Sequence, residues 1–436
     1  MPRVLIAALA ALALLVPVSE AQAGIGSRLS RAMAGASSSS SAYVMDSDTN
    51  RVLFARKATV RRSLASNTKL FTTSATLGRL GETGQLATTL VGTGALRSSG
   101  TWDGNLYLRG GGDPTFGARS FNRDYGSDAS PETLAAILHR AGFTKVTGHV
   151  YGDESLWDTR RGGPESGYGV SPWVGPLGAL NFDHGYGKSG FLSDPASYAA
   201  ERLDSALGAE GIKVKGKPGR RAAPGGAYLL AEVRSPSARQ LIRLTNKPSD
   251  NWFAEMLGKG LSVDLKPGGP ARAAGDPVPP TPTVHHADAT RAAPLPGPGT
   301  SRAGARAAAR FARTLGATPH LVDGSGMSRA DKASPRSVAL LLDGMRARDD
   351  FQSFYDSLPI AGRDGTLDNR MRHGAAAGRC HGKTGTLTGV SALSGYCTTR
   401  GGRTVVFSIL MNGVGDTNAA RSIQDRMANT IAGWKG

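Results

Sequence analysis

Near the start of the chain, apolar and polar positions alternate in a pattern that predicts two short strands joined by a turn. Residues 42–57 read AYVMDSDTNRVLFARK, with apolar stretches on either side of the polar turn DSDTN. The next segment, 66–81, has Leu70 and Leu77 at helical spacing and ends at a glycine, which predicts a helix. Ahead of both, five consecutive serines at 37–41 predict a short flexible linker.

The pattern changes between residues 86 and 225. Short apolar stretches at 105–110 and 145–153 alternate with glycine-rich turns, and helical spacing occurs at 131–142 and 197–211. This mixture predicts a separate, smaller α+β domain at 86–225, inserted into the rest of the chain.

The remainder of the chain returns to longer helical and strand-like segments. Three strand-like segments follow one another closely, which predicts a meander, and four segments have helical spacing. The strands are expected at 380–387, 394–399 and 404–412, and the helices at 237–248, 251–261, 335–347 and 419–434. Ser334 is expected as the N-cap of the third helix and Pro335 as its first residue. Residues 24–85 and 226–436 are therefore predicted to form one α/β domain, an α+β sandwich.

A proline-, alanine- and glycine-rich stretch interrupts this second part at 264–303. Nine of the 24 prolines fall between Pro267 and Pro298, and no aromatic residue occurs between Phe253 and Phe311. Such a stretch has too little apolar surface to offset the entropy lost on ordering, so a disordered surface insertion is predicted.

Composition narrows the class of protein. A chain of 436 residues with 39% hydrophobic residues is typical of a globular protein of two or three domains. Collagen-like, coiled-coil and polytopic membrane proteins are excluded. The net charge of +18 favours an anionic partner, either nucleic acid or an anionic cell envelope, although it also fits a soluble, arginine-rich surface.

The first 23 residues have the pattern of a secretory signal peptide. Arg3 supplies the positive charge, residues 4–16 are apolar, and residues 21–23 form an A-x-A cleavage site. The protein is therefore expected to be exported, to the periplasm or the outside of the cytoplasmic membrane, with an uncleaved anchor as the alternative. Export disfavours nucleic acid as a partner and favours the anionic cell envelope.

Three short motifs carry candidate chemistry, and each lies on the type of element that its role requires. They are S-x-x-K at Ser66–Lys69, S-D-N at Ser249–Asn251, and K-T-G at Lys383, Thr384 and Gly385, followed by Thr386. Any one of them is weak evidence, but the ordered trio is typical of penicillin-binding proteins and certain β-lactamases.

The first motif combines a nucleophile with a base. Ser66 is expected at the start of a helix, where backbone N–H groups favour developing negative charge. Lys69 follows one helical turn later on the same face. A desolvated lysine can lose its proton near neutral pH and then accept the proton of the serine hydroxyl.

The other motifs supply binding and proton-transfer groups. Ser249 is predicted to relay a proton to the leaving amine, and Asn251 to hydrogen-bond a substrate amide. Lys383 offers a positive charge to a substrate carboxylate, and the N–H groups of Ser66 and Thr386 are predicted to form an oxyanion hole. No H-E-x-x-H zinc motif occurs, and neither a metal nor a cofactor is predicted.

Beyond the trio, the chain resembles the D-alanyl-D-alanine carboxypeptidase/endopeptidase family, the class C low-molecular-mass penicillin-binding proteins. The resemblance includes LASNTKLFTT, LYLRGGGDPTFG, SDNWFAEML, DGSGMSR, LPIAGRDGTL and KTGTLTGVSALSGYC, which together span most of residues 42–415. It implies a transpeptidase/β-lactamase-like serine hydrolase domain, with another domain inserted after the nucleophile helix.

The resemblance also implies roles and partners. Ser66 would be the acylated serine and Lys69 its base, with Ser249 and Asn251 as the second motif. Lys383, together with Thr384 and Thr386, would face the substrate carboxylate. The expected substrates are peptidoglycan peptides ending in D-Ala-D-Ala, and β-lactams are expected as inhibitors. A serine β-lactamase and a catalytically inactive wall-binding scaffold remain as alternatives.

Two further segments of the resemblance have no assigned role. Residues 323–326, DGSG, are interpreted as a structural turn near the cleft. Arg363 and Asp364 either line the cleft or hold a loop in place.

The two cysteines of the chain are predicted to face each other. If the turn after the K-T-G strand is centred between residues 388 and 389, paired residues sum to 777, and 380 plus 397 is 777. Cys380 and Cys397 could then form a cross-strand disulfide. Two buried free thiols are the alternative.

Overall fold

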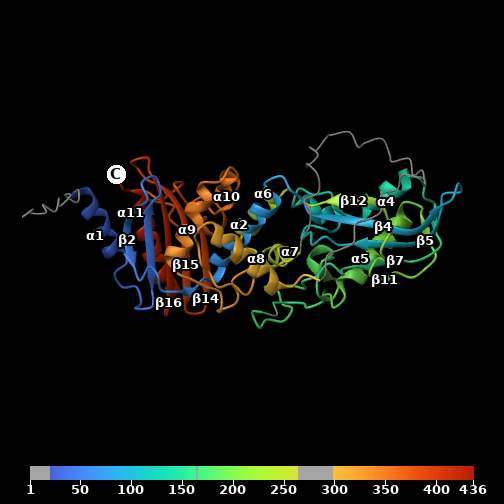
Figure 1. The fold of residues 1–436 in the computed structure, drawn as a ribbon, viewed down its shortest axis with the longest axis horizontal. Helices are drawn as coiled ribbons and strands as arrows, with labels where there is room; N and C mark the ends of the chain where they lie inside the picture. Colours follow the sequence, from blue (N-terminus) through green and yellow to red (C-terminus); the bar gives the residue numbers. More distant parts are fainter. Residues whose placement is uncertain (1–19, 164, 264–297) are drawn as a thin grey trace, which may run out of the picture.

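The computed structural model describes residues 20–163, 165–263 and 298–436 of the chain. The molecule is elongated, with one β-sheet near each end and a group of helices between them (Figure 1). The predicted signal peptide lies almost entirely outside the described residues, and so does most of the proline-rich stretch.

The first sheet is covered by helices on both faces. Its five antiparallel strands have the order β14, β15, β16, β1, β2. Along β1, Val44 faces the core shared with α1 and α11, whereas Tyr43 and Met45 face the core shared with α9. The elements are β1 (Ser41–Asp46), β2 (Arg51–Arg56), β14 (Cys380–Leu387), β15 (Val390–Thr398), β16 (Thr404–Asn412), α1 (Glu20–Ala32), α9 (Pro335–Arg346) and α11 (Thr417–Ala432).

A group of helices packs around a central helix, α2, beside this sheet. Ten consecutive residues of α2, from Thr68 to Leu77, are buried, because α6, α7 and α8 surround it. Gly304 of α8 lies so close to α7 that a Cβ there would be 1.9 Å from the carbonyl oxygen of Gly258. These elements are η1 (Ala65–Asn67), α2 (Thr68–Leu80), α6 (Ala238–Asn246), α7 (Asn251–Gly260), α8 (Ser301–Thr314), α10 (Phe351–Ser357), η3 (Gly365–Leu367), and the paired strands β3 (Arg62–Ser63) and β13 (Lys332–Ala333).

The second sheet lies at the other end of the molecule, and α4 and α5 cover one of its faces (Figure 1). Leu90 and Leu108 face these helices, whereas Val91 and Tyr107 form a small cluster on the opposite face. The elements are β4 (Ala87–Leu96), β5 (Thr101–Arg109), β6 (Lys145–Val146), β7 (Val150–Asp153), β10 (Lys213–Val214), β11 (Gly219–Arg220), β12 (Tyr228–Arg234), α4 (Pro131–Arg140) and α5 (Pro195–Ala209). Short elements beside them are α3 (Arg119–Arg123), η2 (Asp183–Gly185), β8 (Tyr186–Gly187) and β9 (Gly190–Phe191).

Two predicted boundaries differ from the structure. Strand β12 pairs with β4, so the second sheet continues to Arg234, nine residues beyond the predicted end at 225. The predicted insertion at 264–303 extends too far, because Gly299 bridges to Trp157 and Ser301 begins α8. Proline and glycine content alone did not reveal that Thr300 caps this helix, its side chain accepting from the Ala303 N–H at 3.1 Å.

The serine run at 37–41 is not a flexible linker, and that prediction was wrong. Ser40 and Ser41 are buried, and Ser41 is the first residue of β1, opposite Leu410 of β16. The Ser37 hydroxyl donates to the carbonyl oxygen of Asn412. Serine hydroxyls bond readily to nearby backbone groups, so a short serine run can be ordered where strands are close.

The K-T-G strand has the register expected from its turn. Cys380 pairs with Cys397 and Lys383 with Ser394 across β14 and β15. Cys380 and Cys397 are joined by a disulfide, buried between the first sheet and α11.

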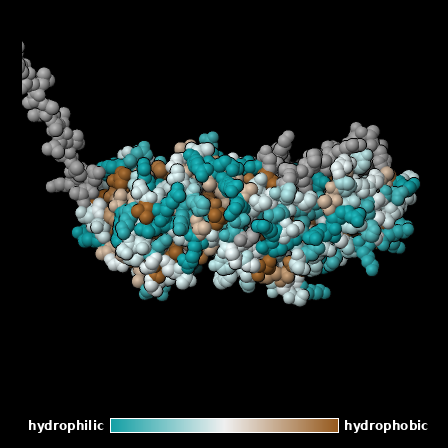
Figure 2. All heavy atoms as spheres, turned by 60° about the horizontal axis from the view of Figure 1, so that its bottom comes forward, coloured by the Kyte–Doolittle hydropathy of each residue, from teal (hydrophilic) through white to brown (hydrophobic). Residues whose placement is uncertain are grey.

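The exterior is mainly polar on the face shown in Figure 2, where hydrophobic residues are scattered in small groups. Among the described residues, no helix has both the length and the apolar character needed to cross a bilayer.

Candidate active site

Ser66 and Lys69 lie at the start of the central helix and contact each other. Ser66 is in the short helix η1, half-buried, and Lys69 is fully buried in the first turn of α2. The Lys69 Nζ is 3.0 Å from the Ser66 Oγ. Ala65 has a φ of 46°, in the left-handed region, so the backbone turns sharply just before the serine.

Lys69 is surrounded by hydrogen-bond acceptors rather than by a partner carboxylate. Its Nζ lies 2.7 Å from the Asn251 Oδ1 and 2.8 Å from the Ser325 carbonyl oxygen. Burial lowers the pKa of Lys69 to about 8, although the nearby carboxylates of Asp250 and Asp323 act in the opposite direction. A neutral lysine amine is therefore accessible close to physiological pH.

Lys383 is the second buried lysine of the site. Burial, followed by the charge of Lys69, lowers the pKa of Lys383 well below its usual value. Its Nζ donates to the carbonyl oxygen of Thr384 at 3.0 Å. The Asn67 side chain donates to the Lys383 carbonyl oxygen at 2.9 Å, which ties β14 to the segment that carries Ser66.

Strand β14 is the edge of its sheet and presents every second N–H outward. The Gly382 N–H donates to the carbonyl oxygen of Pro359, outside the sheet, so the register directs the N–H of Thr384 and Thr386 the same way. The Thr384 hydroxyl is 2.7 Å from the hydroxyl of Thr366, and Thr386 is exposed.

Gly385 allows β14 to lie directly against the nucleophile segment. A Cβ built at Gly385 would be 2.9 Å from the Leu64 carbonyl oxygen and 3.0 Å from the Ser66 nitrogen. Both contacts are to backbone atoms, which cannot move aside as a flexible side chain can. The glycine of K-T-G is therefore required for the close approach of Thr386 and Ser66.

The S-D-N motif forms a tight turn into α7. Ser249 has a φ of 64°, and the Asp250 side chain caps the helix by accepting from the Phe253 N–H at 2.8 Å. Asn251 then points its amide oxygen at Lys69. Within the described part of the chain, the half-buried Ser249 hydroxyl has no hydrogen-bond partner, and it lines a hollow of about 470 Å³ together with Asp250 and Asn251.

Two further groups at this centre were not predicted from the sequence. Ser325 contributes its backbone carbonyl to Lys69, and backbone groups leave no mark on the residue type. Glu255 is buried and accepts from the N–H groups of Gly324 and Ser325 at 2.8–3.2 Å. Glu255 is the one acidic residue in an otherwise mainly apolar predicted helix, four residues after Asn251. Its position one helical turn from a motif residue could have marked it as part of the site.

The two segments without an assigned role turn out to be supports. The DGSG turn is held by Asp323, which accepts from the N–H groups of Gly326 and Ser328 at 2.7 Å. Asp364 accepts from the Ile360 N–H at 2.7 Å and from the Lys247 ammonium at 2.5 Å, so this residue fixes a loop. The interpretation of residues 323–326 as a structural turn agrees with these contacts, and of the two alternatives for Asp364 they favour the one in which it holds a loop in place.

A family model described as the D-Ala-D-Ala carboxypeptidase 3 (S13) family matches residues 27–188, 183–318 and 292–433, which together are most of the chain. The chain belongs to the S13 family. The resemblance found in the sequence is thereby confirmed, and the protein is a serine-type D-Ala-D-Ala carboxypeptidase.

Curated relatives match this chain along most of their length. A D-alanyl-D-alanine carboxypeptidase of Actinomadura sp. (strain R39) is 27% identical over 91% of this chain and 82% of its own. Carboxypeptidase DacB of Mycolicibacterium smegmatis is 30% identical over 89% of this chain and 79% of its own.

A solved structure shares the fold. Penicillin-binding protein 4 of Haemophilus influenzae matches with a TM-score of 0.72 at 20% identity, over 92% of this chain and 97% of that one. The predicted α/β serine hydrolase fold is confirmed.

Proposed function

We propose that this S13 peptidase trims peptidoglycan stem peptides ending in D-Ala-D-Ala through an acyl-enzyme on Ser66. The observation that carries the residue assignment is the 3.0 Å contact between the Ser66 hydroxyl and a fully buried Lys69 whose pKa is lowered to about 8. This pair supplies a nucleophile and a base in one helical turn.

Acylation begins with proton transfer. The neutral Lys69 amine accepts the Ser66 hydroxyl proton as Oγ bonds to the carbonyl carbon of the scissile amide. The electron pair of the carbonyl bond moves to its oxygen, which accepts hydrogen bonds from the N–H groups of Ser66 and Thr386. The outward N–H of Thr386 and the steric need for Gly385 support this arrangement.

The acyl-enzyme forms when the tetrahedral intermediate collapses. The C–N bond breaks, and the departing amine takes a proton that originates on Lys69 and passes through the Ser249 hydroxyl. The position of Ser249 two residues before Asn251, whose amide oxygen contacts the Lys69 amine, supports this role. Water then attacks the ester carbonyl carbon while the neutral Lys69 amine accepts one of its protons. The bond between the acyl carbon and the Ser66 Oγ breaks, Oγ takes that proton from Lys69, and the peptide leaves as an acid that loses its own proton to solvent.

The K-T-G strand supplies the substrate contacts. The carboxylate of a bound substrate would favour the charged form of Lys383, whose pKa is otherwise lowered by burial and by the charge of Lys69. Thr384 and Thr386 offer hydroxyl groups to the same carboxylate. Asn251, already oriented by Lys69, donates its amide N–H groups to the peptide backbone of the substrate. A terminal D-alanine satisfies these contacts through its carboxylate.

β-Lactams are proposed as covalent inhibitors. Their strained amide presents the same carbonyl and carboxylate groups, and a structure of the Haemophilus influenzae protein with a bound β-lactam supports the parallel. The sequence has no E-x-x-L-N segment between the first two motifs to supply a further base, so slow deacylation is proposed rather than β-lactamase turnover.

The proposed location is outside the cytoplasmic membrane. The signal-peptide pattern of residues 1–23 supports export, and the Cys380–Cys397 disulfide favours an oxidising compartment. The net charge of +18 favours association with an anionic envelope.

D-Alanine release tests the proposed reaction. The purified protein is incubated with a soluble pentapeptide ending in D-Ala-D-Ala and, separately, with a cross-linked stem-peptide dimer. We expect the wild-type protein to release D-alanine from the pentapeptide or monomer from the dimer. Ser66→Ala should release neither. Turnover that persists in Ser66→Ala would contradict the assignment.

A further inference from the structure

A row of arginines covers the outer face of helix α8, away from the catalytic centre. At 100° per residue these positions fall within an arc of about 80°, and they extend over about 16 Å of helix. All four are exposed, and they are Arg302, Arg306, Arg310 and Arg313.

The opposite face of α8 is locked in the protein core. Its small residues are buried against α2 and α7, which fixes the rotation of the helix. They are Gly304, Ala305, Ala308, Ala309 and Ala312. The arginines are therefore held outward on a rigid support.

The row forms one wall of a groove of about 550 Å³, whose other wall is the segment from Pro319 to Val322. His320 lines this groove, and the exposed Lys332 lies beside it because the two residues form an antiparallel bridge. None of the lining residues carries a carboxylate.

Most of these positive charges lack an intramolecular partner. Arg302 pairs with Glu165 at 3.3 Å, but Arg306, Arg310 and Arg313 have no carboxylate partner among the described residues. Like charges three or four residues apart on a helix repel one another. Among the described residues nothing neutralises these three charges, so the groove favours an added anion.

The length of the arginine row indicates the shape of the ligand, and its guanidinium groups indicate the ligand's chemistry. A single small anion would engage only one or two arginines, so a row of about 16 Å suits a linear ligand with several charges. An arginine guanidinium group donates two parallel hydrogen bonds to a phosphate. The oxygens of one phosphate can accept hydrogen bonds from arginines on two successive turns of the helix. We propose that the α8 groove binds a linear phosphate-bearing polyanion.

This site would act independently of catalysis, so the inference does not rest on the proposed peptidase mechanism. The wall formed by residues 319–322 continues into the turn that contacts Lys69 through Ser325. A polymer bound in the groove would hold the enzyme beside that polymer. The substrate contacts on β14 would stay free.

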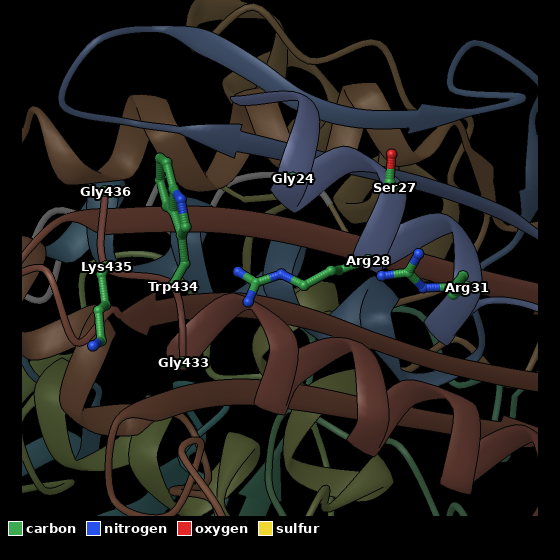
Figure 3. A pocket seen from close by; sticks show the side chains of 8 residues that line it. All are labelled: Gly24, Ser27, Arg28, Arg31, Gly433, Trp434, Lys435 and Gly436. Carbon is green, nitrogen blue, oxygen red and sulfur yellow. The ribbon is translucent and has the colours of Figure 1, made fainter. Parts of the chain in front are cut away.

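The test uses the full chain and fluorescently labelled inorganic polyphosphate of about 15 phosphates. In one variant, Arg306, Arg310 and Arg313 are all replaced by Gln, which keeps helix propensity and removes three charges. The matched control replaces Arg28, Arg31 and Lys435 by Gln. These residues line a second basic hollow, between α1 and the end of the chain (Figure 3).

Binding is measured by anisotropy over a series of salt concentrations. The α8 variant is expected to bind at least tenfold more weakly, with the slope of log affinity against log salt reduced by about 2, since each phosphate contact contributes about 0.7–0.9. The affinity of the control variant for polyphosphate should stay within about twofold of the wild-type affinity. Equal losses in both variants, or no loss in the α8 variant, would overturn the proposal.

Three further readouts separate the alternatives. Replacing the same arginines by Lys should restore only part of the affinity, because lysine keeps the charge but lacks the fork. Equal affinity for poly-L-glutamate of the same length, or binding to anionic lipid vesicles in preference to polyphosphate, would overturn the phosphate assignment. Hydrolysis of a small D-Ala-D-Ala peptide should be unchanged, and a parallel loss of hydrolysis in the α8 variant would overturn a site that acts independently of catalysis.

Discussion

At the scale of single residues, the protonation of Lys69 governs the proposed chemistry. The side chain is fully buried, and three neutral acceptors surround its amine: Ser66, Asn251 and Ser325. Because burial penalises the charged form, the pKa is lowered from 10.5 to about 8. Below that pH most molecules carry the protonated, inactive lysine.

The acylation rate is therefore expected to rise with pH. The neutral fraction of Lys69 increases about tenfold per unit well below pH 8 and levels off above it. Stopped-flow acylation by a fluorescent penicillin from pH 6 to 9.5 measures this profile. Lys69→Arg stays protonated, so its acylation should be slower by orders of magnitude at every pH. A flat wild-type profile would show that another group accepts the proton.

Glu255 is expected to tune the same profile as a positioning residue. Its negative charge raises the pKa of Lys69, so Glu255→Gln should move the midpoint of the acylation profile to lower pH. The exposed Glu201→Gln on α5 serves as the matched control and should leave the midpoint in place. An unchanged midpoint in a folded Glu255→Gln protein would contradict this electrostatic role.

At the scale of elements, the approach of β14 to the nucleophile segment builds the site. Gly385→Ala would place a Cβ against backbone atoms of Leu64 and Ser66. Such overpacking typically costs about 1–3 kcal/mol. We expect a lower unfolding free energy together with slower acylation, measured by denaturant unfolding and penicillin labelling. Gly208 lies inside α5, where an added Cβ meets nothing within 4 Å, so Gly208→Ala should neither lower the unfolding free energy nor slow acylation. A Gly385→Ala variant that behaves in the same way would contradict the packing argument.

The disulfide is expected to stabilise the same strand. Cys380 and Cys397 close a loop of about 18 residues, for which the chain-entropy model gives about 3 kcal/mol. Denaturant unfolding with and without reductant measures the difference. Mass mapping of the non-reduced, alkylated protein is the control for the bond itself, and two alkylated thiols without reductant would refute it.

At the scale of the whole molecule, local patterns predicted the elements better than their boundaries. The two strands at 42–57 and the meander at 380–412 were predictable, because the spacing of apolar residues and the residue types in turns are local features of the sequence. The pairing of β12 with β4 joins segments about 140 residues apart, and no local pattern reports such a contact. The boundary at 225 failed for that reason.

Part of the candidate site was predictable from the sequence, and part of it was not. Side chains of the three motifs were predictable, because their chemistry requires particular residue types at Ser66, Lys69 and Lys383. The Ser325 carbonyl and the outward N–H of Thr386 are backbone groups, so only the fold reveals them. The steric reason for Gly385 likewise depends on a contact between distant segments.

Peptide mapping of the penicillin adduct by mass spectrometry tests whether Ser66 is the nucleophile. The purified protein is labelled, digested and sequenced, with Ser66→Ala treated in parallel. We expect one penicilloyl group on the peptide containing Ser66 and none in the variant. An adduct on any other residue, or labelling that survives in Ser66→Ala, would contradict that assignment.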